Sequence, residues 1–171
     1  MPAGSTIKLN SSLEQNPSNL SGTMNPDVYE LNRMAVEGLV PMFVAEKQLF
    51  CYRVLHTGNG LVSEGLSPRY TIMTLLGLRE LERTGARTPF DVNAIYASFT
   101  QDMSWIRGAG DLGLMIWLTA AFAPDQIDGL FRRCDLGTAL NRYVDAREAR
   151  TMELAWLLAG LSHAGLACPS S

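Results

Sequence analysis

The sequence predicts an all-α fold in which successive αα-hairpins form two layers, with one short β-hairpin or extended loop near residues 49–64. Three observations lead to this class. From Ser67 onward the apolar residues recur with the period of an α-helix, and helix-start signals separate the runs. These helices alternate between apolar on all sides and apolar along one stripe. Around residues 49–64, in contrast, Phe50, Tyr52 and Val54 alternate with other residues and lead into a Gly-Asn-Gly turn.

The chain of 171 residues divides into two parts by composition. Residues 1–25 are rich in Ser, Asn, Pro and Gly and show no periodicity, so we expect a disordered N-terminal arm. Residues 26–171 are expected to form a single helical domain, because 47% of the chain is hydrophobic and the length suits one core. Its first helix should begin at Asn25-Pro26-Asp27 and end at Pro41, which cannot continue a helix.

The later helices are bounded by capping signals. Ser67-Pro68 predicts a start, with Ser as N-cap and Pro in the first turn, and Gly85 predicts the end of that helix. The remaining boundaries follow from similar signals: starts at Thr88-Pro89, near Asp111, at Ala123-Pro124-Asp125 and near Asp145, with the last helix ending around Gly165.

The first, third and last of these helices are apolar nearly all round, whereas the second and fourth carry one apolar stripe. A helix that is apolar on every side is expected to be enclosed, and a striped helix to lie on an outer surface. The alternation therefore predicts two concentric layers. Gly77, in the first enclosed helix, is expected to let a neighbouring helix approach closely.

Composition limits the partners and the compartment. A formal net charge of −3 gives no electrostatic reason to expect nucleic acid, and the longest uncharged apolar run, Leu112–Ala123, is too short to span a bilayer, which needs about 20 residues. The sequence shows no secretory signal, so a cytoplasmic location is expected. Only 18% of residues are charged, below the ~25% typical of soluble domains. This deficit predicts apolar surface that something else covers.

The segments GLSPRYTIMTLLGL and GAGDLGLMIWLTAAF resemble the inner-helix starts of the α/α-toroid superfamily, which includes six-hairpin glycosidases, polysaccharide lyases, sugar epimerases and terpenoid cyclases. The resemblance covers about residues 65–166 and implies an incomplete toroid with about half of the hairpins. The chain also loosely resembles uncharacterised bacterial proteins associated with polysaccharide gene clusters. It lacks the Asp-x-Asp-Asp motif of terpenoid cyclases.

In such a two-layer arrangement the inner helices run in one direction, so their N-termini gather at one end. Helix N-termini and arginines together suit an anionic ligand. The expected ligand-binding residues are Arg69, Arg107, Arg150, Tyr52 and Glu64, with Arg53, His56 and Arg147 nearby. The expected catalytic residues are the carboxylates of Asp111 and Glu153, with Tyr70 as a further proton donor or stacking surface.

Structural roles compete with these functional ones. Asp111 is also placed as a first-turn helix cap, and Glu153 as the partner of an arginine in a structural salt bridge. Arg69 and Tyr70 can equally anchor the hairpin, and Arg147 and Arg150 can form solvated ion pairs with Glu148. His163 is expected to be a core histidine. No metal-site or cofactor motif is present, so neither a metal nor a cofactor is expected.

Two functions remain open at this point. The first is a carbohydrate-active or glycan-binding protein that recognises an acidic sugar at the inner-helix N-termini, with catalysis left undecided. The alternative is a non-catalytic helical interaction module, or a truncated product, that docks a partner chain or a second copy. In that case the docking surface is an exposed apolar flank from Trp156 to Leu166.

Overall fold

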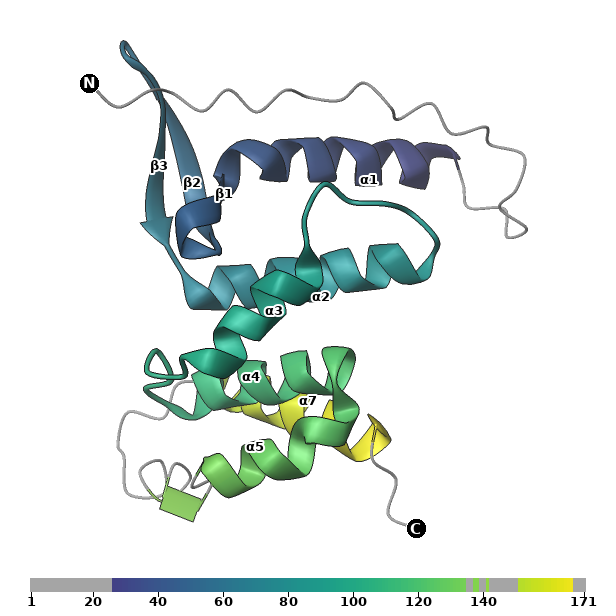
Figure 1. Ribbon diagram of the computed structural model, residues 1–171, viewed down its shortest axis with the longest axis vertical. Coiled ribbons are helices and arrows are strands. Elements are labelled where there is room, and N and C mark those ends of the chain that lie inside the picture. Colours follow the sequence, from purple (N-terminus) through teal and green to yellow (C-terminus); the bar gives the residue numbers. More distant parts are fainter. Residues whose placement is uncertain (1–25, 135–136, 139–140, 142–150, 168–171) are drawn as a thin grey trace.

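The computed structural model describes residues 26–134, 137–138, 141 and 151–167. The predicted arm of residues 1–25 and the predicted helix start near Asp145 lie outside the described residues. The elements in chain order are α1 (Pro26–Leu39), η2 (Val40–Met42), β1 (Phe43–Val44), η3 (Ala45–Lys47), β2 (Leu49–Thr57), β3 (Gly60–Leu66), α2 (Pro68–Arg83), α3 (Val92–Gln101), α4 (Ala109–Phe122), η4 (Pro124–Gln126), α5 (Ile127–Arg133) and α7 (Thr151–Ala167) (Figure 1).

The all-α prediction is wrong, because the chain contains a three-stranded antiparallel sheet in the order β1-β2-β3 and is a mixed α and β fold. The hairpin itself lies where the sequence placed it. Its strands pair from Thr57 opposite Gly60 to Cys51 opposite Leu66, and Gly60 has a positive φ of 111° that favours glycine. The sequence did not predict β1, because a strand of two residues is too short to show an alternating pattern.

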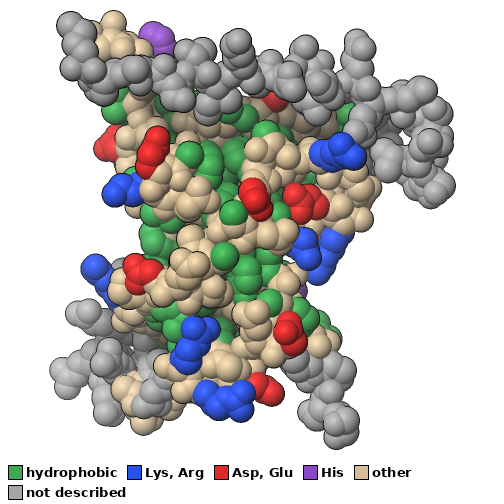
Figure 2. All heavy atoms as spheres, viewed as in Figure 1, with side chains coloured by type: hydrophobic (Ala, Val, Ile, Leu, Met, Phe, Trp, Pro, Cys, Tyr) green, Lys and Arg blue, Asp and Glu red, His purple; other side chains and the backbone are tan. Residues whose placement is uncertain are grey.

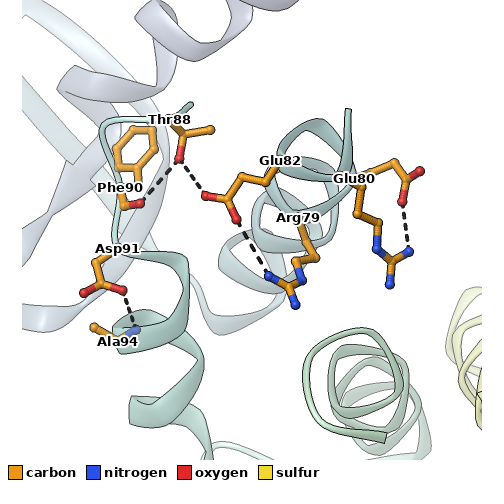
Figure 3. Close-up of polar contacts among 8 residues, drawn as sticks. Arg79, Glu80, Glu82, Thr88, Phe90, Asp91 and Ala94 are labelled. Atoms are coloured by element: carbon orange, nitrogen blue, oxygen red, sulfur yellow. Dashed lines mark hydrogen bonds and ion pairs between the residues drawn. The ribbon is translucent and has the colours of Figure 1, made fainter. Parts of the chain in front are cut away.

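Capping explains where the helices begin. The Ser67 hydroxyl accepts a hydrogen bond from the Tyr70 N–H at 3.4 Å, so the predicted start of α2 is confirmed. The predicted start at Thr88-Pro89 is wrong: α3 begins at Val92, where the Asp91 carboxylate accepts from the Ala94 N–H at 3.0 Å (Figure 3). The Thr88 hydroxyl instead donates to Glu82 on α2 and ties the α2–α3 loop to that helix.

The sheet and the helices share one core. Phe43, Phe50 and Phe90 form an aromatic cluster in which ring centroids lie 4.9–5.5 Å apart. Beside it, the buried Thr71 hydroxyl accepts from the Phe50 N–H at 2.9 Å and donates to the Ser67 carbonyl at 2.9 Å. These bonds fix the start of α2 against the base of the hairpin.

The predicted order of enclosed and outer helices is correct for α4 and wrong for α2 and α7. Ten residues of α4 are buried, and they lie on all its sides. In α2 the buried residues form one stripe, and in α7 only Leu157, Gly160 and Ala164 are buried. The two-layer arrangement of the sequence prediction is therefore not the observed one: α4 is central and α7 packs along one of its sides (Figure 1).

Glycines bring α4 and α7 unusually close. A Cβ atom on Gly113 would collide with the Leu157 backbone and lie 2.5 Å from the Trp156 carbonyl oxygen, and a Cβ on Gly160 would collide with the Gly113 backbone. Gly77, which the sequence predicted for such a contact, has no atom within 4 Å of an added Cβ. The close approach therefore lies between α4 and α7 and not at α2.

Candidate functional site

The N-terminal turns of α2, α4 and α7 meet at one end of the helical part, and Arg69 of α2 joins them. Its Nε lies 2.5 Å from Asp111 Oδ1 in α4, and its Nη2 lies 3.5 Å from Glu153 Oε1 in α7. The predicted meeting of helix N-termini is therefore confirmed for these three helices, although the surrounding fold differs from the predicted one.

Asp111 is the most buried charged group of this junction, at 3% exposure. Both of its carboxylate oxygens are engaged: Oδ1 accepts from Arg69, and Oδ2 accepts from the Arg107 backbone N–H at 3.0 Å. A carboxylate out of water needs such donors. Asp111 thus holds the loop before α4 and the first turn of α2 together.

Glu153 reaches the junction because α7 lies directly against the first turn of α4. A Cβ on Gly110 would lie 2.9 Å from the Glu153 Cα, so only glycine leaves space for the glutamate there. The Glu153 side chain is 12% exposed and faces Arg69. Its structural role as the partner of an arginine, one of the two alternatives from the sequence, is observed.

Arg69 has aromatic as well as acidic neighbours. Its guanidinium carbon lies 5.4 Å from the centroid of the Trp156 ring of α7, within the range of a cation–π contact. The hydrogen bond to Asp111 raises the pKa of the Arg69 guanidinium above its usual value, against the opposing effect of burial. Arg69 is therefore a charged group that contacts two carboxylates and one aromatic ring.

A small pocket of about 210 Å³ opens beside the junction. Its lining comes from the end of β3, the start of α2, the loop before α4 and the first turn of α4: Leu66, Ser67, Pro68, Arg69, Trp105, Arg107 and Asp111. Within the described residues no carboxylate lies at ion-pair distance from the Arg107 guanidinium. Arg107 is therefore the cation of this pocket that has charge to offer a ligand.

Tyr70, Tyr52 and Glu64 are not among the residues that line the pocket. Tyr70 is 56% exposed, and its ring lies 6.2 Å from that of Tyr52 on the outer surface. Glu64 forms an ion pair with Arg53 across the hairpin at 2.7 Å. Arg150, together with Arg147, lies outside the described residues.

The two histidines also lie away from the junction. His56 is exposed on the hairpin, and His163 stacks on Trp117 with ring centroids 4.7 Å apart. His163 is exposed, so the prediction of a core histidine is wrong. Among the described residues no three His, Cys, Asp or Glu side chains come close enough to hold a metal ion.

Sequence reasoning missed Ser67, Trp105 and Trp156 as parts of this region. The sequence analysis gives Ser67 a capping role alone. Because Ser67 is the N-cap of α2, it also lines a pocket that forms at the N-terminus of that helix. Trp105 lies two residues before Arg107, in the loop that the Asp111–Arg107 hydrogen bond folds back onto α4. No periodic signal marks a residue in such a loop.

We found no family model, no curated protein and no solved structure that matches this chain. The resemblance to the α/α-toroid superfamily therefore stays a prediction. Functional conclusions rest on the geometry described above.

Proposed function

We propose that this chain is a non-catalytic interaction module that docks another polypeptide through the exposed face of α7. The observation that carries the proposal is the exposure of large apolar side chains on this helix: Leu158 at 67% and Leu166 at 80%, with Met152 and Leu154 also exposed. From Leu154 to Ala167 the helix has no charged residue. Although Ser162 and His163 are also exposed there, large apolar side chains on an uncharged helix face are typical of a docking surface.

The contacts on the opposite face of α7 strengthen this interpretation. Leu157, Gly160 and Ala164 pack against α4, and the mutual contact of Gly113 and Gly160 fixes the rotation of α7 about its axis. A helix held this tightly cannot turn to bury Leu158 and Leu166. The surface is therefore presented as a fixed feature.

The polar junction supports binding better than catalysis. Both oxygens of Asp111 accept hydrogen bonds, and Glu153 faces Arg69, so neither carboxylate is placed as an unengaged acid or base.

The docking proposal is tested with the variant Leu158→Glu/Leu166→Glu. We expect the unmodified chain to bind an apolar fluorescent dye, and the variant to lose this dye binding while keeping its circular dichroism spectrum. Asn93→Glu, which adds a charge at an exposed polar position of α3, is the control and should behave as the unmodified chain. Equal dye binding by the unmodified chain and the α7 variant would overturn the proposal.

A second candidate function is recognition of an acidic sugar at the pocket, in line with the sequence prediction. The observation that favours it is Arg107, which is among the residues lining the pocket at the N-terminal ends of two helices and whose guanidinium has no carboxylate partner among the described residues. A guanidinium in this position suits the carboxylate of a sugar acid.

Nuclear magnetic resonance titration with glucuronate tests this candidate, with glucose as the neutral control. We expect saturable shifts with glucuronate alone, and a loss of affinity of about tenfold or more in Arg107→Gln, because a charge-assisted hydrogen bond is lost. Arg87→Gln, an exposed arginine away from the pocket, should bind as the unmodified chain. Shifts that glucose also produces, or that survive Arg107→Gln unchanged, would end this candidate.

A further inference from the structure

The outer strand of the hairpin, β3, has an open edge. In the sheet order β1-β2-β3 it pairs only with β2, so along the described part of the chain the main-chain groups on its other side have no strand partner. All its residues except Glu64 are exposed, including Leu61 and Val62. The unpaired N–H and C=O groups of a strand edge are recognised by another extended strand.

Between Gly60 and Gly65, which both have a positive φ, the side chains of β3 do little to protect its edge from pairing. The strand contains no proline and no lysine, and its one charged residue, Glu64, is already neutralised by Arg53 of β2 at 2.7 Å. The distal part of the hairpin is also exposed on both sides, and a two-stranded hairpin gains stability from a third strand. Both facts favour the addition of a strand.

The sequence of β3 is complementary to itself when two copies run antiparallel about Ser63. In that register Leu61 of one copy lies opposite Gly65 of the other, Leu66 opposite Gly60, and Val62 opposite Glu64. Each leucine thus meets a glycine, and no two like charges lie directly opposite.

The two glycines offer different surroundings to an incoming leucine. An added Cβ on Gly60 has no atom within 4 Å, and Gly65 is covered by the ring of Tyr52, which is itself partly exposed. Leu61 of the second copy, opposite Gly65, would therefore pack against the Tyr52 ring. Leu66 of the second copy, opposite Gly60, would enter open space. Aromatic and branched cross-strand pairs of this kind stabilise sheets.

We propose that β3 binds β3 of a second copy of this chain, antiparallel and centred on Ser63, and joins two sheets across a two-fold axis. This contact is independent of the α7 face. It gives the chain two separate interaction surfaces, one for its own copy and one for a docked partner.

The substitution Ser63→Lys tests the proposal, because it places two ammonium groups opposite each other on the two-fold axis. The unmodified chain should be a dimer by light scattering across a dilution series, and Ser63→Lys should raise the dissociation constant at least tenfold. Ser63→Glu should do the same. An equimolar mixture of the two variants should restore the dimer, because unlike charges then meet at the axis, and this rescue excludes misfolding as the cause.

Two controls locate the contact. His56→Lys carries the same charge on the neighbouring strand β2 and should leave the dimer intact. The dimer should also persist in Leu158→Glu/Leu166→Glu. A monomeric unmodified chain, failure of the mixture to restore association, or loss of the dimer in either control would overturn the proposal.

Discussion

The helices α4 and α7 have almost the same character in sequence and opposite environments in the fold. Both are apolar on all sides and both begin with an acidic residue in the first turn. Ten of the fourteen residues of α4 are buried, against three of the seventeen of α7. An apolar helix is unstable in water, but its composition does not say whether the covering surface belongs to the same chain. The low charge content predicts exposed apolar surface, and the exposed side of α7 is a surface of that kind.

The contact between α4 and α7 explains why one helix is buried and the other is largely exposed. Glycines at the crossing allow the backbones to touch, so α7 covers one side of α4 and leaves its own far side exposed. Figure 2 shows hydrophobic side chains over the middle of one face with charged side chains around them, and because α7 lies behind α4 in this view, the exposed side of α7 is on the opposite face.

The largest expected difference in the free energy of unfolding is between two leucine truncations, one in α4 and one in α7. Leu114→Ala in α4 removes a fully buried side chain and should lower the free energy of unfolding by about 2–5 kcal/mol. Leu158→Ala in α7 should change it by less than about 0.5 kcal/mol, because that side chain is already in water. Urea unfolding of dilute protein measures both. If both variants lose the same free energy of unfolding, the α7 face is covered in solution and the two helices do not differ in environment.

The next largest effect concerns the glycine contact. Gly113→Ala places a Cβ against the backbone of Leu157 and the Trp156 carbonyl, which cannot move as a flexible side chain can. We expect the free energy of unfolding to fall by about 1–3 kcal/mol, the usual cost of overpacking. Thermal unfolding measures it, and a variant as stable as the unmodified chain would show that α7 is not held at this distance.

Much of the local structure was predictable because it depends on neighbouring residues. The hairpin follows from alternation and Gly-Asn-Gly, and the start of α2 follows from Ser67-Pro68, since caps and turns are short-range features. The predicted start of α3 is wrong because Thr88-Pro89, like Ser67-Pro68, has the pattern of an N-cap residue followed by proline. That Asp91 is the capping residue instead depends on the tertiary structure.

The junction was predictable in part. Arg69, Asp111 and Glu153 are predicted to lie together because the N-termini of the enclosed helices are expected to gather at one end, and the structure pairs them. The tertiary arrangement was not predictable, since whether a glycine contacts a backbone depends on which helix lies beside it. The close contact therefore occurs at Gly113 and not at Gly77.

Removing the charge of Asp111 tests the junction at which the two helices begin. Asp111→Asn keeps an acceptor for the Arg107 N–H but weakens the bond from Arg69, so we expect a loss of about 1–2 kcal/mol, reduced because Arg69 is partly exposed. Denaturant unfolding checks this, with Glu30→Gln on the exposed surface of α1 as a control that should cause no measurable change. If both variants behave alike, the junction contributes nothing beyond an ordinary surface ion pair.

The smallest expected effect has the opposite sign and isolates the role of the helix contact. Gly77→Ala lies inside α2, where an added Cβ meets no atom within 4 Å. Alanine loses less conformational freedom than glycine when a helix forms, so this substitution should raise the free energy of unfolding by about 0.5–1 kcal/mol. The same change at Gly113 should lower it. Because both variants add one methyl group to a helix, the difference in sign can come only from what lies opposite, and thermal unfolding of the pair measures the steric cost of the α4–α7 approach directly.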